Sequence, residues 1–485
     1  LGVGHLVAVF LDPTSSPFFV LGATVVDHTP KWLKDNAIRW FGTNDKLALA
    51  ITMGVVMVAA AALIGQVARR RLGPAIGLLG ALGLVVAVLA LQRPTATPFF
   101  AVPAVVGALA GIAALCVLFL VPTETTAHAG PTRRGFLIAL TAVAAGAAAA
   151  GAAGRFLGTR LRDIAADRAG FVLPRVAAPA PPVTAEMDKG VAGLTRFVTP
   201  NPDFYRIDTA LQLPQLTRAQ WRLRIHGMVE REIRLDFDEL SSRRAVESVI
   251  TLTCVSNEVG GDLVGTARWT GYRLGELIAE AGPSADADMV LSRSIDGFTA
   301  GTPLAAVRDT PDALLAVAMN GEALPVAHGY PARLIVPGLY GYVSATKWVI
   351  DLEITRFDRA RAYWTDRGWA PRAPIKTASR IDVPAAFATL PAGPVTVAGV
   401  AWAQGRGVEA VEIQVDDGPW QPTTLAAAYS LDTWRQWTWT WDASPGSHAL
   451  RVRAVDGAGD VQTDARATPF PDGATGRHSR VVTVR

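Results

Sequence analysis

The sequence is short of cysteine and of charge. Its 485 residues include two cysteines, Cys116 and Cys254, and only 18% of them are charged. Cys116 lies inside an apolar run and Cys254 in a water-soluble part, so the two are not expected to meet, and a disulfide framework is excluded. A composition that is 50% hydrophobic also excludes a disordered, a collagen-like or an ordinary soluble chain.

Histidine and clustered basic residues are scarce as well. The chain has seven histidines, and they form no Cys/His cluster with the spacing of a zinc site. Only His5 and His28 lie near apolar runs, without obvious facing partners, which favours a membrane anchor over a haem-binding bundle. The net charge of +4 comes from basic residues that are scattered or flank apolar runs, so there is no basic stripe for nucleic acid.

Apolarity is concentrated in the first third of the chain. Four runs without a charged residue are long enough to cross a hydrocarbon layer of about 30 Å as helices; they cover 47–67, 74–91, 98–121 and 135–154. The opening LGVGHLVAVFL is interpreted as the end of a fifth helix, and FFVLGATVV (18–26) as re-entrant or interfacial because it is too short to span alone. We therefore expect residues 1–154 to form a transmembrane helical anchor.

The arginines between these runs predict the orientation of the anchor. An RRR triplet (69–71) and an RR pair (133–134) fall on one side, and the loop between them has only Arg93. The positive-inside rule makes the arginine-rich side cytoplasmic and everything after the last run extracytoplasmic, on a bacterial cytoplasmic membrane. KWLKDNAIRWF (31–41) suggests an amphipathic surface helix. TRRGFLIAL (132–140) resembles a twin-arginine export signal, although an ordinary arginine pair at a helix mouth would look the same.

The rest of the chain reads as a linker and two domains. Residues 155–195 become Pro/Ala-rich and are expected to act as a semi-rigid spacer. Residues 196–389 mix short strands and helices, which indicates an α+β domain. Residues 390–485 show five or more strands with turn glycines, which predicts an immunoglobulin-like β-sandwich. The alternating Trp437, Trp439 and Trp441 are typical of a sandwich core rather than of a ligand platform.

Cys254 is the cysteine outside the apolar runs. It ends an apolar strand and begins the polar, glycine-rich loop CVSNEVGGDLVG (254–265). A lone cysteine in such a place is usually a structural thiol, but a reachable thiolate could act as a nucleophile or as a soft metal ligand. Spacing alone leaves the role open, because nothing in the sequence places His226 or His328 beside it.

Longer segments carry a resemblance to a known family. ITLTCVSN (250–257) resembles the strand that holds the molybdenum-ligating cysteine in the sulfite oxidase family of molybdopterin enzymes. FVTPNPDFYRID (197–208) resembles the segment that grips the pterin, and AHGYPARLIVPGLYGYVSATKW (327–348) resembles the phosphate-binding stretch. The final sandwich resembles the family's C-terminal dimerisation domain. The resemblance covers about 196–485 and implies a membrane-anchored member of this family.

The resemblance implies a mononuclear molybdenum–molybdopterin cofactor with Cys254 as the metal ligand. Arg333 and Lys347 would bind the terminal phosphate of the pterin. The other cofactor-binding positions that it implies are Asn201, Tyr205, Arg206, Ser294, His328, Ser344, Ala345 and Thr346. The candidates for the catalytic pocket beside Cys254 are Arg206, Trp364, Arg367 and Trp369.

Departures from the family pattern leave the substrate open. Sulfite oxidases have arginines after the cysteine, where this chain has Glu258 and Val259, and an acidic residue there should repel sulfite. A branch that includes the catalytic subunit of the periplasmic protein-methionine-sulfoxide reductase also lacks these arginines but has no sandwich. We expect two-electron oxygen-atom transfer on a sulfoxide or another small S- or N-oxide, less so on sulfite. A separate cytochrome or quinone-linked protein would exchange the electrons, and the sandwich suggests a homodimer by analogy.

Two alternatives place the function elsewhere. The first is a membrane-tethered binding or adhesion protein with an Ig-like tip, in which Cys254 is structural and Arg333 lies on the surface. The second is a transporter with an appended sensor domain. It predicts polar or charged residues at membrane depth, and the four clear runs carry no charged residue. Molybdenum in the purified protein would exclude the binding-only alternative.

Overall fold

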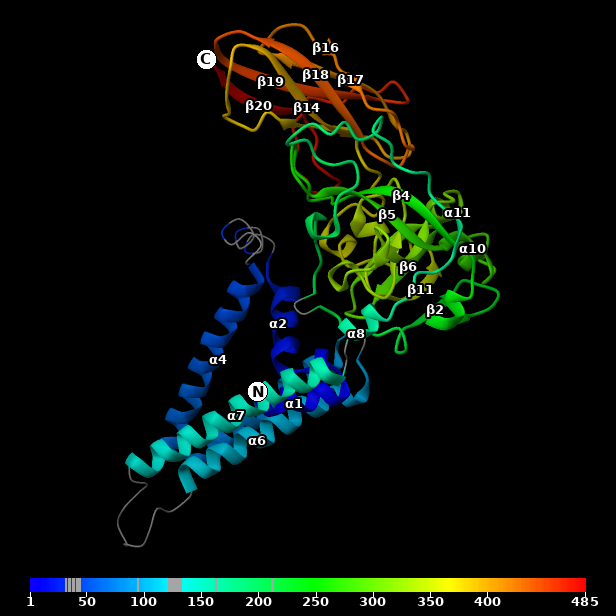
Figure 1. Cartoon of the computed structure of the whole chain (residues 1–485). Helices are drawn as coiled ribbons and strands as arrows, with labels where there is room; N and C mark the ends of the chain where they lie inside the picture. The colour runs from blue at the N-terminus through cyan, green and yellow to red at the C-terminus, as the bar shows by residue number, and fades with distance from the viewer. Residues whose placement is uncertain are drawn as a thin grey trace. The chain divides into compact units, whose positions relative to one another are not determined.

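The computed structural model describes residues 1–30, 33, 36, 40, 45–93, 96–120, 133–161, 164–210 and 213–485. These residues divide into two compact units. The first unit contains Leu1–Ile164 and Thr209–Leu213, and the second contains Ala165–Asp208 and Pro214–Arg485. The first is built of helices and the second mainly of strands (Figure 1).

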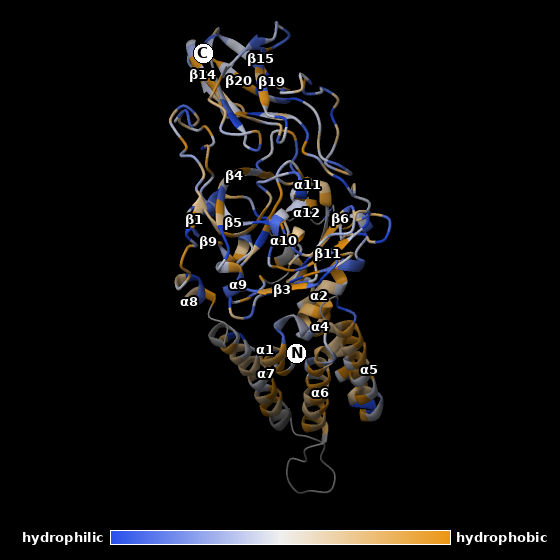
Figure 2. Ribbon diagram, turned by 90° about the vertical axis from the view of Figure 1, so that its right-hand side faces the viewer, coloured by the Kyte–Doolittle hydropathy of each residue, from blue (hydrophilic) through white to orange (hydrophobic). Residues whose placement is uncertain are grey.

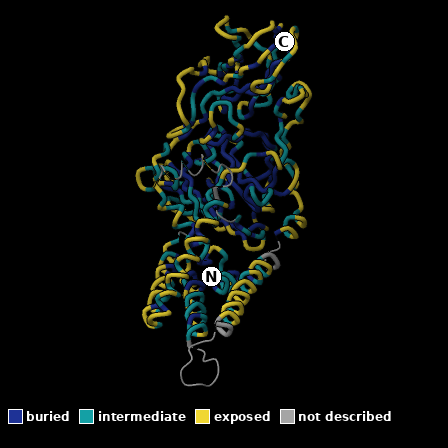
Figure 3. The backbone as a smooth tube through the Cα atoms, turned by 90° about the vertical axis from the view of Figure 1, so that its left-hand side faces the viewer, coloured by how far each residue is buried: buried dark blue, intermediate teal, exposed yellow. Residues whose placement is uncertain are grey.

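Four helices of the first unit are long and apolar enough to cross a membrane, among the residues that the structure describes. They are α4 (Asp45–Arg70), α5 (Leu72–Leu91), α6 (Val102–Leu120) and α7 (Arg133–Leu161). Figure 2 shows them largely in the colour of hydrophobic residues, and Figure 3 shows much of their surface exposed. At most 22% of the apolar window of any of them is buried within the chain. Apolar surface on this scale needs a lipid or protein partner. The predicted runs coincide with these four helices.

Two shorter helices complete the described part of this unit. They are α1 (Gly2–Leu11) and α2 (Pro17–His28), both shorter than a membrane span. Asp12 separates them, because its carboxylate accepts a hydrogen bond from the Thr14 amide at 2.8 Å. The Cα of Gly2 approaches the backbone of Ala147 on α7, a close contact that small residues allow between helices. The predicted surface helix at 31–41 lies mostly outside the described residues, as do the side chains of the RR pair.

The larger part of the second unit contains two sheets in its described residues. The first sheet contains β1 (Val176–Ala178), β4 (Ala245–Thr253), β5 (Val264–Arg273), β8 (Leu314–Met319), β9 (Glu322–Ala323) and β10 (Arg333–Ile335). The second contains β2 (Arg222–Gly227), β3 (Ile233–Asp236), β6 (Met289–Ser294), β7 (Thr299–Pro303) and β11 (Val349–Thr355). The helices are α9 (Phe237–Ser241), α10 (Leu274–Ala279), α11 (Leu304–Arg308) and α12 (Gly341–Ser344).

The sequence explains why β4 and β8 are central strands. β8 is a continuous apolar run, as strands covered on both faces usually are, whereas β4 also contains a glutamate, a serine and two threonines. Nearly all residues of both strands are buried. The buried Trp221 donates its indole N–H to the carbonyl of Val349 at 2.8 Å, joining the start of β2 to β11. This mixture of short strands and helices fits the predicted α+β class.

Residues 378–485, called here the C-terminal β-domain, form two further sheets among the described residues. One contains β12 (Ala378–Val383), β14 (Gly393–Trp402), β17 (Thr424–Leu425) and β18 (Arg435–Ala443). The other contains β13 (Thr389–Leu390), β15 (Val408–Val415), β16 (Gln421–Pro422), β19 (Gly446–Asp456) and β20 (His478–Val484). Trp437 and Trp441 are buried in a shared apolar core, and Trp439 packs against it. The tryptophan stripe is therefore core, as its spacing predicts. Because β12 pairs with β14, this domain begins before the expected boundary at 390.

Most of the segment expected to be a spacer, from Ala165 onward, belongs to the second unit. After α8 (Ile164–Ala169), β1 pairs in parallel with β4. The Tyr429 hydroxyl donates to the carbonyl of Pro181 at 2.8 Å, and the amide of Lys189 donates to the Gln436 side chain at 2.7 Å. A proline-rich chain can lie extended along a sheet edge and still accept hydrogen bonds at its carbonyls. The composition therefore fits this packed segment, residues 171–195, called here the strap, as well as it fits a free linker.

Candidate functional site

Cys254 lies at the end of the central strand β4. Its thiol is buried, with 8% of the residue exposed, and the Ser256 amide points at the sulfur from 3.4 Å. Burial raises the pKa of this thiol, and the nearby Lys347 charge acts in the opposite direction. A buried thiol with a raised pKa stays protonated at neutral pH when no metal is bound. With a cation nearby it is suited to binding a metal ion, which displaces the proton.

Two cations stand on either side of a turn at Gly329. A Cβ at this glycine, whose φ is +111°, would lie 3.0 Å from Cβ of Arg333 and 3.1 Å from Cβ of Lys347. Arg333 is 5% exposed and donates from Nη1 and Nη2 to the carbonyls of His328 and Ala345, at 3.1 and 3.3 Å. Its Nε is buried and has no hydrogen-bond partner among the described residues. An unpaired donor of this kind points to a ligand.

The electrostatics of Arg333 and Lys347, called here the cationic cluster, favour the binding of an anion. Burial lowers the pKa of Arg333 to about 10. It also lowers that of Lys347 to about 8, although the Asp208 carboxylate, 2.9 Å from Nζ, opposes the shift. Burial and the same two cations lower the pKa of His328 to about 4, so this imidazole is neutral at pH 7. A doubly charged phosphate would relieve the burial cost of both cations.

Tyr205 and α12 connect the cationic cluster to the cysteine. A Cβ at Gly341, the first residue of α12, would lie 3.8 Å from the carbonyl oxygen of Thr253 and 3.8 Å from the Tyr205 hydroxyl. Burial raises the pKa of Tyr205, with Cys254 adding to the rise and Arg333 opposing it. The structure therefore brings together Cys254, Tyr205, His328, Arg333 and Lys347, which the sequence predicts as one site.

Several of the other predicted cofactor residues are engaged within the protein. The Asn201 amide nitrogen donates to Glu322 and its oxygen accepts from Asn320, at 2.5 and 2.8 Å. The buried Ser344 hydroxyl donates to the carbonyls of Leu339 and Tyr340. The Ala345 amide donates to the Gly341 carbonyl, and the Thr346 hydroxyl pairs with Ser292 at 2.7 Å. Ser294 accepts from the Asp296 amide at 3.4 Å in the turn after β6. These polar groups are hydrogen-bonded within the protein, so their predicted direct contacts with a cofactor would require new hydrogen bonds.

The remaining catalytic candidates lie in two places. Arg206 is half-exposed and pairs with Asp208 at 2.8 Å, beside Lys347. Trp364 and Trp369 belong to an aromatic cluster, where Trp369 contacts Tyr342 of α12 and Phe470 of the C-terminal β-domain, with ring centroids 5.9 and 5.4 Å apart. Arg367 lies over the Tyr363 ring at 3.5 Å and donates to its carbonyl. Trp369 therefore contacts α12 through Tyr342, and Trp364 packs on Trp369. Arg367 contacts Tyr363, a near neighbour in the sequence.

Sequence reasoning missed two contributors. Asp208 is the carboxylate that balances Lys347, and Trp269 lies under Arg333, with its ring centroid 5.1 Å from the guanidinium carbon. Asp208 closes the segment FVTPNPDFYRID, and a carboxylate there was a readable signal. Trp269 gave none, because its position in β5 predicts only a core residue.

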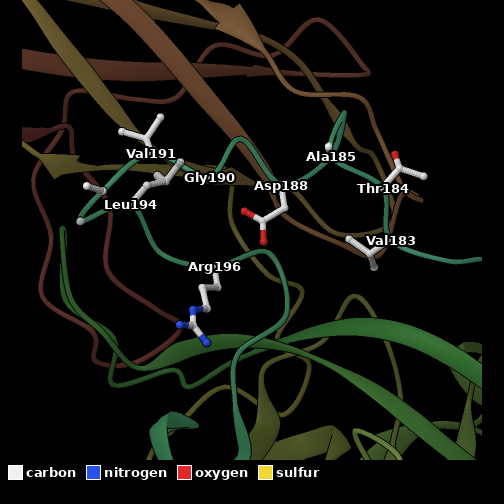
Figure 4. Close-up of a pocket in the computed structure, with 10 residues that line it drawn as sticks. Val183, Thr184, Ala185, Asp188, Gly190, Val191, Leu194 and Arg196 are labelled. Atoms are coloured by element: carbon white, nitrogen blue, oxygen red, sulfur yellow. The ribbon is translucent and has the colours of Figure 1, made fainter.

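A cavity of about 590 Å³ lies apart from these residues. It is lined by residues of the strap from Val183 onward and by Arg196 (Figure 4). None of the predicted site residues belongs to its lining. The candidate site therefore rests on the chemistry of its side chains, not on this cavity.

Comparison with known proteins agrees with this chemistry. Residues 210–364 match the family model described as the oxidoreductase molybdopterin binding domain. Human mitochondrial sulfite oxidase is 30% identical over 321 residues, which cover 56% of this chain and 58% of the human protein. The uncharacterized oxidoreductase YuiH of Bacillus subtilis is 30% identical over 154 residues, 32% of this chain and 74% of that protein. The chain thus spans less than two thirds of the length of the human sulfite oxidase.

The fold has a solved counterpart as well. The sulfane dehydrogenase SoxCD of Paracoccus pantotrophus aligns with a TM-score of 0.53 and 22% identity, over 60% of this chain and 84% of that chain. The matched domain contains Cys254, Arg333 and Lys347. The buried thiol, the unpaired Nε of Arg333 and the surplus of cations fit a metal-bound pterin that ends in a phosphate. The chain therefore belongs to the sulfite oxidase family of molybdenum-dependent oxidoreductases, and its cofactor is molybdenum–molybdopterin.

Proposed function

We propose that this protein is a membrane-anchored oxidoreductase, with its molybdenum site outside the cytoplasm, that removes an oxygen atom from a sulfoxide or another small S- or N-oxide. The reaction takes two electrons and two protons and releases the reduced substrate and water. The observation that carries the proposal is the buried Cys254 thiol near the charge of Lys347, which lies across Gly329 from Arg333. Sulfite oxidation is the less favoured direction.

The residues of the chain divide the work. When bound, the cofactor supplies two-electron oxygen-atom transfer. Cys254 would hold the metal as a thiolate, and the charge of Lys347 favours that ionised form. Arg333 would donate from the unpaired Nε to the terminal phosphate, and its fixed fork would orient the pterin. His328, neutral at pH 7, can hydrogen-bond a polar pterin edge without adding charge.

The charges around the loop that follows Cys254 support a neutral substrate. Glu258 is exposed four residues after Cys254. Arg380, which also reaches this loop, is held by Asp382 at 2.6 Å. Arg367 stacks on Tyr363. A sulfite dianion would approach Glu258 against its charge, whereas a sulfoxide or an N-oxide has no net charge to repel.

The anchor and the redox partner complete the proposal. The arginines at 69–71 and 133–134 favour a cytoplasmic position for the ends of α4 and α7 that carry them. A cytochrome or a quinone-linked protein would deliver the electrons. The predicted Ig-like character of the C-terminal β-domain and its role in a homodimer belong to the same proposal.

The test measures molybdenum and pterin in detergent-purified full-length protein, beside the variant Cys254→Ser. We expect about one molybdenum per chain in the wild type and an altered metal spectrum in the variant. Dimethyl sulfoxide and trimethylamine N-oxide are then assayed with reduced methyl viologen, and sulfite with ferricyanide. Turnover of sulfite alone would overturn the proposed substrate class. Wild type without molybdenum, from a host that makes the cofactor, would overturn the proposed enzyme.

A further inference from the structure

The loop that begins at Cys254 closes on itself. The Cys254 amide donates to the carbonyl of Leu263 at 2.9 Å, and the Leu263 amide donates back to the Asn257 side chain at 2.9 Å. The Asn257 amide in turn donates to the Cys254 carbonyl at 3.0 Å. The position of the sulfur is therefore tied to the conformation of the whole loop 254–263, called here the cysteine loop.

The C-terminal β-domain grips the far end of this loop. Arg380 of β12 donates from Nη1 to the carbonyl of Gly261 at 2.7 Å. The ring of His478, at the start of β20, lies so close to Gly260 that a Cβ there would overlap it. Gly260 also has φ of +80°, so both the space and the backbone at this position require glycine.

The same domain holds the strand that leads into the loop. Gln404 donates to the carbonyl of Thr251 and to the hydroxyl of Thr253, both at 3.3 Å. The amide of Trp434 donates to the Thr251 hydroxyl at 2.8 Å. The grip therefore extends from β4, just before Cys254, to the cysteine loop just after it.

His478 and Arg380 are themselves fixed before they meet the loop. His478 is 9% exposed, and its Nδ1 accepts a hydrogen bond from the Ile381 amide at 3.0 Å. Burial, aided by Arg480 and Arg380, lowers the pKa of this imidazole to about 4, so the ring is a neutral acceptor at pH 7. Arg380 is 7% exposed and is held by Asp382 and by the Thr195 hydroxyl, at 2.6 and 2.8 Å. Groups that are locked in this way can impose a conformation on a loop.

We propose that His478 and Arg380 are positioning residues for Cys254, and that the C-terminal β-domain is part of the metal site because it sets the conformation of the cysteine loop. The metal-ligand role of Cys254 is taken from the proposed function. The positioning of its loop is a property of the chain without cofactor, and it can be measured there.

The test follows the reactivity of the Cys254 thiol in full-length protein made in a host that cannot synthesise the cofactor. All variants carry Cys116→Ala, so that Cys254 is the remaining cysteine. Iodoacetamide reaches a buried thiol only when the loop opens. We expect alkylation about tenfold faster in His478→Ala and in Arg380→Met, because each loses a contact that opposes opening. Amide hydrogen exchange of residues 254–263 should accelerate in parallel.

Two further variants separate positioning from general destabilisation. His478→Gln keeps a neutral acceptor for the Ile381 amide, and we expect it to restore most of the slow alkylation. Val411→Ala removes two methyl groups from the core of the same domain, where Val411 is 1% exposed, without touching the cysteine loop. It should lower the melting temperature and leave the alkylation rate unchanged. An increase in Val411→Ala equal to that in His478→Ala, or unchanged rates in both, would overturn the proposal.

The cofactor-loaded enzyme gives the second readout. In the loaded His478→Ala variant we expect shifted g-values of the Mo(V) electron paramagnetic resonance signal, because the angle of the Cys254 sulfur at the metal changes. Unchanged g-values together with an unchanged alkylation rate would refute the proposal that His478 positions Cys254. They would not affect the proposal that the protein is a molybdenum enzyme. If the wild-type protein bound no molybdenum, the proposed function would be refuted. Faster alkylation of the variants would still support the proposal that His478 and Arg380 position the cysteine loop.

Discussion

Replacing Arg333 by methionine should leave the stability of the cofactor-free protein nearly unchanged but strongly weaken its binding of the cofactor. Burial lowers the pKa of Arg333 from its usual value to about 10. At pH 7 the charged guanidinium therefore subtracts roughly 3 kcal/mol from the free energy of unfolding. Methionine has a similar length and no charge, so the variant Arg333→Met removes this penalty.

The variant also loses favourable contacts. Arg333 donates two hydrogen bonds to carbonyls, worth about 1 kcal/mol each, and lies over the Trp269 ring, worth about another 1 kcal/mol. The gains and losses nearly cancel. We expect the free energy of unfolding of cofactor-free Arg333→Met to stay within about 1 kcal/mol of the wild-type value.

Cofactor retention should change far more. Removing one partner from a buried pair of guanidinium and phosphate costs roughly 3 kcal/mol or more, which corresponds to at least about a hundredfold weaker binding. The assay combines chemical denaturation of cofactor-free protein, followed by tryptophan fluorescence, with molybdenum and pterin content after expression in a competent host. Arg435→Met is the matched control. All three guanidinium nitrogens of Arg435 donate to carbonyls. Burial also lowers the pKa of Arg435, but Glu409 opposes the shift, so this variant should still lose about 1–3 kcal/mol of stability.

The refuting result is specific. If cofactor-free Arg333→Met lost as much stability as Arg435→Met and still retained the pterin, Arg333 would be a structural residue. The unpaired Nε would then carry no information about a ligand.

Three further predictions concern the surroundings of the site. In cofactor-free protein, stability should rise by up to about 3 kcal/mol between pH 8 and 10.5, because burial lowers the pKa of Lys347 to about 8 and the penalty of its charge disappears as it deprotonates; denaturation of Lys347→Met should show no such rise. Tyr330→Phe removes a hydrogen bond of 2.6 Å to Asp167 and should cost about 1–2 kcal/mol in denaturant unfolding, with faster loss of cofactor because Tyr330 precedes Arg333 on the same loop. Trp434→Phe leaves the carbonyl of Phe197 without its buried donor and should cost about 1–3 kcal/mol by the same measurement, and a loss below 0.5 kcal/mol would contradict this role.

The sequence alone was sufficient for elements that have a strong period or a long apolar run. The four long apolar helices, the strands around Cys254 and Lys347, and the tryptophan stripe were all predictable, because each has a clear hydrophobic period or a long apolar run. The strap at 171–195 was not predictable. Its proline-rich composition suits a spacer and an extended edge segment equally, and its partners Tyr429 and Gln436 lie more than 240 residues away.

The site divides in the same way. Arg333 and Lys347 were accessible through family resemblance, and the structure brings them to either side of Gly329. The grip of His478 and Arg380 on the cysteine loop had no signal in the sequence, because each residue reads as an ordinary polar position in a β-strand. The sequence shows the paired glycines after Cys254, Gly260 and Gly261. The residues that they contact, His478 and Arg380, belong to a domain that follows more than 100 residues later.

The cationic cluster is best understood as half of a bound state. Arg333 and Lys347 lose solvation on folding, the Asp208 carboxylate pairs with Lys347, and His328 is kept neutral. A chain selected for stability alone would place apolar residues here, since buried ion clusters are often less stable than apolar replacements. The burial cost is recovered when a dianion binds, because whatever binds the folded state stabilises it. The loaded protein should therefore be several kcal/mol more stable than the empty one, and much of that difference should vanish in Arg333→Met.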